Sequence, residues 1–140
     1  MSIRTAKAEW NGTLKDGHGT MNFSNYSGPY TYKSRFEEGD GTNPEELAGA
    51  AICGCYSMFL SALISAENLV PSRIKTSARV HLGRDDIGPV VSLIELQCEV
   101  RCDGLSEDKF EELADTAKGK CPISRLFSSA EINLEANLLM

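Results

Sequence analysis

The longest segment of the chain without charge is residues 47–66. Pro44 suits the first position of a helix, and Glu45 and Glu46 place negative charge in its first turn, where the helix dipole favours it. This pattern predicts a helix from about residue 44 to residue 64 or 65. Because the segment carries no charge on any side, the predicted helix has no face that is suited to water.

A helix without a polar face needs apolar cover all round, which one small sheet cannot provide. A second copy of the chain is the simplest source of that cover, so the pattern predicts a homodimer. The segment also has about the 20 residues that cross a bilayer, but glycines and serines dilute it and no basic or aromatic residues flank it. We therefore predict a buried helix in a soluble protein and no membrane partner.

Alternating polar and apolar positions predict strands on both sides of this helix. Residues 3–10 and 12–22 are expected to form a hairpin that turns at Asn11-Gly12, followed by a third strand over residues 29–36. After the helix we expect strands 73–83 and 89–101, a helix 105–118 capped by Ser106, a short helix opened by residues 120–123, and a strand 131–138. This grouping predicts a single α+β domain, residues 1–140, with a mostly antiparallel sheet.

The amino-acid composition and the net charge exclude some classes of protein function. The hydrophobic content of 41% and the charged content of 24% are ordinary for a folded soluble protein. The net charge of −6 and the absence of a lysine or arginine cluster argue against nucleic acid as a partner. The N-terminal ten residues alternate like a strand and lack the apolar core of a signal peptide, so we expect a cytoplasmic protein.

The five cysteines are the candidate chemistry, and in the cytoplasm they are expected to be reduced. No CxxC pair occurs and the chain has two histidines, so we expect no metal site and no cofactor. Cys121 precedes a proline at a helix start, where amides and the helix dipole would lower its pKa, unless it merely caps the helix. Cys55 lies in an apolar helix, where burial would make it inert unless a cation such as Arg35 lies nearby.

Five short motifs resemble the osmotically inducible protein C (OsmC) family, which is related to the organic hydroperoxide resistance (Ohr) proteins. They are RFE at 35–37, GTNPEEL at 41–47, GAA at 49–51, CYSM at 55–58 and KCPIS at 120–124. The resemblance runs nearly the full length of the chain. It implies an OsmC-like α+β fold in which the sheet wraps around the central helix of an intertwined homodimer.

The resemblance also implies an activity and its residues. Members of the family are thiol peroxidases that reduce hydroperoxides, preferentially organic ones and hydrogen peroxide less well. By this match Cys55 is the peroxidatic thiol, Cys121 is the resolving thiol, and Arg35 and Glu45 hold and activate the thiolate. An arginine in the strand before the helix is the arrangement of the OsmC branch. The expected reductant is an external dithiol, either lipoyl-type or thioredoxin-like, and the expected setting is stress defence.

The spacing of these residues constrains the site. Ten residues separate Glu45 from Cys55 along one helix, which corresponds to about 15 Å. An unbroken helix therefore cannot bring both to one site within a subunit. We expect composite sites in which Arg35 and Glu45 of one chain face Cys55 of the other.

Cys53 departs from the family pattern. It is either inert or a competitor of Cys121, although residues two apart on a helix point to different faces. The roles of Cys98 and Cys102 are left open. An alternative function is a non-catalytic dimeric protein that binds an apolar ligand at the subunit interface, and a third is a structural stress protein with inert thiols.

Overall fold

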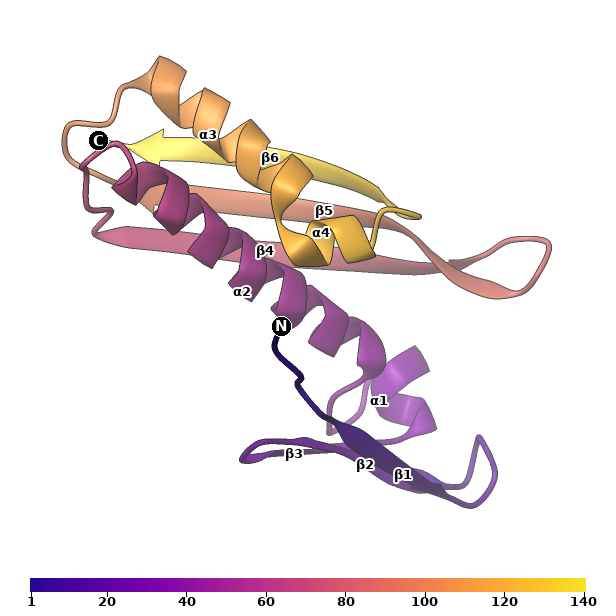
Figure 1. Cartoon of the computed structure of the whole chain (residues 1–140). Helices are drawn as coiled ribbons and strands as arrows, with labels where there is room; N and C mark the ends of the chain where they lie inside the picture. Colours follow the sequence, from indigo (N-terminus) through magenta and orange to yellow (C-terminus); the bar gives the residue numbers. More distant parts are fainter. The chain divides into compact units, whose positions relative to one another are not determined.

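The computed structural model describes residues 1–140, which form two compact units, Met1–Leu47 and Ala48–Met140. The elements are β1 (Lys7–Asn11), β2 (His18–Phe23), β3 (Tyr26–Tyr30), α1 (Tyr32–Phe36), α2 (Pro44–Ser65), β4 (Arg73–Arg84), β5 (Pro89–Arg101), α3 (Glu107–Lys120), α4 (Pro122–Leu126) and β6 (Glu131–Leu139) (Figure 1). All strand pairs are antiparallel except β5–β6, which is parallel. The predicted α+β class with mostly antiparallel pairing is confirmed. The prediction of a single domain is not tested by this division into units.

The first unit contains the three-stranded sheet β1-β2-β3. The predicted hairpin is confirmed, because β1 pairs antiparallel with β2, but its loop runs past Asn11-Gly12 to Gly17. Inside the loop, the Gly17 N–H donates to the Thr13 carbonyl at 2.8 Å and the Asp16 N–H donates to Thr13 Oγ1 at 3.1 Å. These local hydrogen bonds stabilise a longer turn. β1 also begins later than predicted, at Lys7.

The predicted third strand over residues 29–36 is confirmed only at residues 29 and 30 and is wrong over residues 31–36. The strand β3 ends at Tyr30, and the next residues form the helix α1. Thr31 and Ser34 form a capping box, since the Ser34 N–H donates to Thr31 Oγ1 at 3.1 Å and the Thr31 N–H donates to Ser34 Oγ at 2.9 Å. Arg35 therefore lies on a short helix and not in a strand.

The predicted central helix is confirmed as α2, which is continuous over 22 residues. Its start is fixed by Asn43, whose Oδ1 accepts from the Glu46 N–H at 2.8 Å. By length and composition α2 could also cross a membrane. In this fold one face of the helix lies in the hydrophobic core, with Ile52, Tyr56 and Leu60 fully buried.

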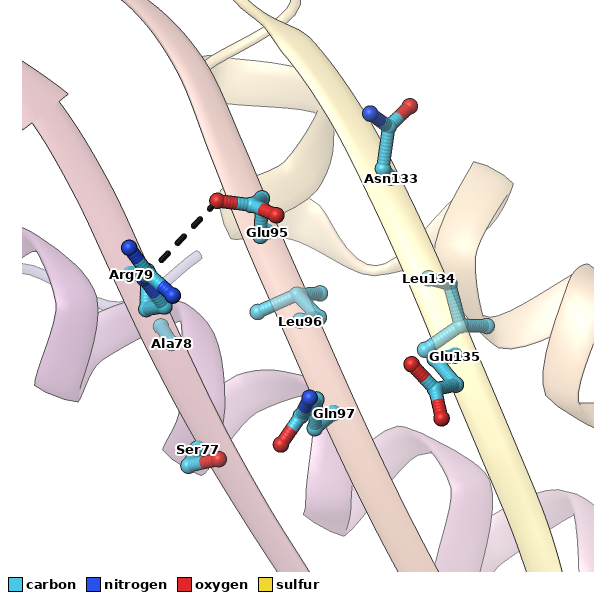
Figure 2. A pocket seen from close by; sticks show the side chains of 9 residues that line it. All are labelled: Ser77, Ala78, Arg79, Glu95, Leu96, Gln97, Asn133, Leu134 and Glu135. Atoms are coloured by element: carbon cyan, nitrogen blue, oxygen red, sulfur yellow. Dashed lines mark ion pairs between the residues drawn. The ribbon is translucent and has the colours of Figure 1, made fainter.

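The second unit is a helical layer on one face of the sheet β4-β5-β6 (Figure 1). Every second residue of β5 faces the core, and the buried ones are Ile94, Leu96, Cys98 and Val100. The intervening residues form a polar face with a shallow recess. Figure 2 shows Ser77, Arg79, Glu95, Gln97, Asn133 and Glu135 along this recess. The one-sided burial follows from the period of two in a strand.

The parallel pair β5–β6 requires a long crossover, which α3 and α4 provide. As predicted, Ser106 caps α3 by accepting from the Lys109 N–H at 3.2 Å. α3 packs on α2, where the Tyr56 hydroxyl donates to the Ala114 carbonyl at 3.2 Å. The crossover therefore places the α3–α4 junction, with Cys121, beside α2.

The opposite face of α2 is apolar but exposed in the single chain. It presents Ala50, Ala51, Gly54, Met58 and Ala62, and Met58 is 77% exposed. A single chain therefore covers one side of this apolar helix and leaves the other side exposed. The predicted homodimer is not tested by a single chain.

Candidate active site

The structure brings Cys55 and Cys121 together, although 66 residues separate them in the sequence. Their two sulfur atoms lie 2.7 Å apart, within hydrogen-bond distance. Cys55 is partly exposed on α2, whereas Cys121 is fully buried. A disulfide has an S–S length of about 2.05 Å, so this pair needs little movement to form one.

The backbone of Cys121 is fixed from both sides. It ends α3 and begins α4, so its N–H donates to the Ala117 carbonyl at 3.0 Å and its carbonyl accepts from the Arg125 N–H at 3.0 Å. Pro122 occupies the first position of α4, as its fixed backbone angle favours. The predicted helix start at Cys121 is confirmed, and it holds this thiol against α2.

The surroundings of Cys55 and Cys121 shift the pKa values of the two thiols in opposite directions. Burial raises the pKa of Cys55, and the hydrogen bond to Cys121 raises it further, while the backbone amide of Ile123 opposes both. Burial also acts to raise the pKa of Cys121, but the hydrogen bond with Cys55 and the amide and hydroxyl of Ser124 outweigh it and lower this pKa. Within one chain, Cys121 is therefore the more acidic thiol of the pair.

Arg35 and Glu45 form a second pair, within the first unit. The guanidinium approaches the carboxylate with two nitrogens: Nη2 donates to Oε1 at 2.7 Å, and Nε donates to Oε1 at 3.1 Å and to Oε2 at 3.3 Å. The side chain of Glu45 is 14% exposed and that of Arg35 is 34% exposed. Such a forked arrangement fixes the plane of the guanidinium and leaves its remaining N–H groups free for another anion.

An aromatic recess surrounds Arg35. Its guanidinium lies 5.1 Å from the ring centre of Phe36, whose ring also packs against Tyr32 at 4.9 Å. The recess has a volume of about 200 Å³ and is lined by Trp10, Leu14, Tyr30, Thr31, Tyr32, Arg35 and Phe36. The sequence does not reveal this recess, because its residues come from three separate elements and the loop of the first hairpin.

The other cysteines lie apart from the thiol pair. Cys53 packs against the hydrophobic core, and burial raises its pKa, as it does for Cys98 and Cys102. Cys98 accepts a hydrogen bond from Thr76, and Cys102 donates to the Asp103 carbonyl. No group of three or more His, Cys, Asp or Glu side chains is arranged to hold a metal ion.

Apolar residues near Cys55 in the sequence have different environments. Tyr56 is fully buried and belongs to the core, and Phe59 packs against that core. Met58 points to the exposed face of α2. The sequence also gives no sign of a role for Ser124, a buried serine in the motif around Cys121 whose amide and hydroxyl lower the pKa of that thiol.

Two adjacent free thiols of unequal acidity, held at a helix junction in an α+β fold, define a thiol-based redox protein. The sequence model described as "OsmC-like protein" matches residues 37–137. The peroxiredoxin OsmC of Escherichia coli (strain K12) is 39% identical over 140 residues, covering 96% of each chain. The organic hydroperoxide resistance protein OhrA of Bacillus subtilis (strain 168) is 30% identical over 95 residues, covering 67% of this chain and 66% of OhrA.

Solved structures agree with this assignment at the level of the fold. The crystal structure of an OsmC-like protein from Mycoplasma pneumoniae superposes with a TM-score of 0.78 at 16% identity, covering 99% of each chain. The chain belongs to the OsmC-like family. It is a thiol-dependent peroxidase in the general sense that its curated relatives establish.

Proposed function

We propose that this chain reduces organic hydroperoxides to alcohols, and hydrogen peroxide less well, in the defence of the cytoplasm against oxidative and osmotic stress. The observation that carries the proposal is the 2.7 Å separation of the Cys55 and Cys121 sulfurs, with Cys55 partly exposed. A peroxide can reach Cys55, and the second thiol is already in place to react with the oxidised product.

The proposed reaction has three steps. The Cys55 thiolate attacks one peroxide oxygen, the O–O bond breaks, and the alkoxide leaves and takes a proton to become the alcohol. Cys55 is then a sulfenic acid, and Cys121 attacks its sulfur with loss of water to form the Cys55–Cys121 disulfide. An external dithiol, lipoyl-type or thioredoxin-like, restores both thiols by exchange and is itself oxidised to a disulfide.

The first step needs a thiolate on Cys55, although burial raises the pKa of this thiol within one chain. A guanidinium next to the sulfur would reverse this effect. We propose that Arg35 of a second copy supplies the charge and that Glu45 of the same copy orients it. Two observations support this arrangement: α2 is unbroken between Glu45 and Cys55, and Arg35 and Glu45 already form a forked ion pair.

The aromatic recess supports an organic substrate. It lies beside the guanidinium that would hold the peroxide oxygens, and its lining is dominated by aromatic rings. An alkyl or aryl group in this recess would be removed from water, which favours organic peroxides over hydrogen peroxide.

A thiol count tests the proposal. Reduced protein is treated with cumene hydroperoxide, and free thiols are counted before and after. We expect a loss of two thiols per chain, no loss in Cys55→Ser, and a trappable sulfenic acid in Cys121→Ser. Cys53→Ala is the matched control on the same helix and should behave as the wild type.

Two results would change this assignment. If Cys121→Ser still forms a disulfide within the chain, Cys53 takes over as the resolving thiol. If the thiol count does not change at millimolar peroxide, the peroxidase proposal is wrong, and a dimeric protein that binds an apolar ligand becomes the better assignment.

A further inference from the structure

The two sulfurs of the Cys55–Cys121 pair differ in exposure and in surroundings, and this difference bears on how a disulfide between them is reduced. We propose that the reductant attacks Cys55, that Cys121 departs as the thiolate, and that the Ser124 hydroxyl is a positioning residue for the departing sulfur. The inference deepens the proposed function by assigning the direction of the reductive step.

The sulfurs of Cys55 and Cys121 differ in how accessible they are to a reductant. Cys121 is fully buried at the α3–α4 junction, whereas Cys55 is partly exposed on α2. A thiolate must approach the sulfur that it attacks from the side opposite the breaking bond, so the attacked sulfur needs an open side. Cys121 has no such opening, whereas the sulfur-bearing side of Cys55 is partly open to solvent.

Stabilisation of the leaving group is the second argument. In thiol–disulfide exchange the more acidic thiol leaves faster. Cys121 meets this condition through donors that remain when Cys55 is in the mixed disulfide: the amides of Ser124 and Ile123 and the Ser124 hydroxyl favour its thiolate against the effect of burial. For Cys55, burial disfavours the thiolate, and the amide of Ile123 is the one backbone donor that opposes this effect.

The buried hydroxyl of Ser124 also supports Cys121 as the leaving group. This serine is 5% exposed, and its Oγ is a buried side-chain oxygen that has no hydrogen-bond partner in the structure. A buried hydroxyl without a partner is costly and calls for an explanation. A thiolate on Cys121 supplies the missing acceptor, so the hydroxyl is satisfied in the state that the exchange reaction produces.

The proposed reduction takes place in two thiol–disulfide exchange steps. The first thiolate of an external dithiol attacks Cys55 Sγ, the Cys55–Cys121 bond breaks, and its electron pair leaves on Cys121. The mixed disulfide joins Cys55 to the reductant. The second thiol of the reductant then attacks the reductant sulfur that is bonded to Cys55. Cys55 leaves as the thiolate, and the reductant becomes a disulfide.

Mapping the mixed disulfide tests the direction. The disulfide is formed with diamide, which oxidises dithiols without peroxide, so the test does not depend on peroxidase activity. The oxidised protein is treated briefly with excess 2-mercaptoethanol, quenched in acid and alkylated with N-ethylmaleimide. Peptide masses should show the mercaptoethanol adduct on Cys55 and the maleimide on Cys121, with an excess of about tenfold over the reverse pattern.

Equal labelling, the reverse pattern or failure of diamide to form the disulfide would overturn the inference. If the direction is as expected while cumene hydroperoxide consumes no thiols, the inference stands and the peroxidase proposal falls. The two failures are therefore distinguishable.

Substitution of Ser124 tests its positioning role. In a Cys55→Ser background, Ser124→Ala should raise the pKa of Cys121, measured as a shift in the pH profile of thiolate absorbance, and Ser124→Thr should restore it. In the otherwise unaltered chain, Ser124→Ala should slow disulfide reduction by about 3- to 10-fold.

Ser128→Ala, at an exposed serine four residues further along the chain, should change neither the pKa of Cys121 nor the rate of disulfide reduction. An unchanged pKa and rate in Ser124→Ala would refute the role of Ser124, and misfolding of that variant leaves the mapping on wild-type protein decisive.

Discussion

Two thiols that are neighbours in space have opposite acidities because their backbones are placed differently. Cys55 lies in the middle of a helix, where the amides of its own turn are already bonded, so burial acts without compensation from them. Cys121 lies at the first turn of α4, where amides are free to stabilise a thiolate. The acidity of Cys55 therefore has to come from outside its own helix.

Removal of the guanidinium tests that source at the level of one residue. Arg35→Ala should raise the pKa of the Cys55 thiol and slow its reaction with cumene hydroperoxide about 10- to 100-fold. Arg35→Lys should recover little of the rate, because an ammonium cannot form the forked contact with Glu45. The measurements are stopped-flow peroxide reduction and the pH profile of thiolate absorbance in Cys121→Ser protein.

The matched control for Arg35 is Arg79→Ala. Arg79 forms its ion pair with Glu95 on the polar face of the sheet, at 3.8 Å (Figure 2). This variant should react with peroxide at the wild-type rate. A normal rate in Arg35→Ala would remove the activation argument and leave Cys55 without a source of acidity.

At the scale of elements, the packing of α3 on α2 holds the thiol pair in place. Tyr56 is fully buried one residue after Cys55, and its hydroxyl reaches the Ala114 carbonyl of α3. Cys121 follows at the end of the same α3. The distance between the two sulfurs thus depends on how these helices pack, and Tyr56 is a direct link between them.

Tyr56→Phe should lower the free energy of unfolding by about 1 kcal/mol at neutral pH, since it removes one buried hydrogen bond. The loss should shrink at high pH. Burial raises the pKa of Tyr56 in the folded state, so above about pH 10 the unfolded wild type loses this proton first and stability falls by about 1.4 kcal/mol per pH unit. The Phe variant lacks this contribution.

Urea unfolding of both proteins at neutral pH and at about pH 10.5 measures the difference. A wild-type advantage that stays constant or grows with pH would show that the tyrosine proton is not linked to folding. A variant as stable as the wild type at neutral pH would show that the α2–α3 hydrogen bond contributes nothing.

At the scale of the whole molecule, the uncovered face of α2 is the main unexplained surface. It is apolar, built largely from small residues, and contains Met58 at 77% exposure. Monomeric soluble proteins rarely leave a continuous apolar face in water. A second copy would cover it, and the same association is required if Arg35 is to reach a Cys55 thiol.

We expect the wild-type protein to sediment as a dimer at micromolar concentration. Met58→Glu should weaken the dimer, because a carboxylate would be buried without a partner, and should reduce peroxidase activity in parallel. Ile87→Glu is the matched control, since Ile87 is 98% exposed at the β4–β5 turn and lies outside α2. Sedimentation of the wild type as an active monomer would contradict both the dimer and the composite site.

The sequence by itself determined the elements whose signals are local. The uncharged segment, Pro44 and the acidic first turn specified α2, and period-two alternation specified β4, β5 and β6. The start of α4 at Cys121 was also readable, because a proline at the first helical position is a local preference. The capping box at Thr31 was a local signal that the aromatic alternation of residues 29–36 concealed.

Tertiary structure decided the quantities that depend on partners distant in the chain. The 2.7 Å approach of Cys55 to Cys121 results from the parallel crossover that lays α3 and α4 beside α2. The orphan hydroxyl of Ser124 and the aromatic recess around Arg35 likewise exist only after separate segments have packed. Residue patterns encode which side chains are buried, but the acidity of a thiol depends on the particular donors that packing brings to it.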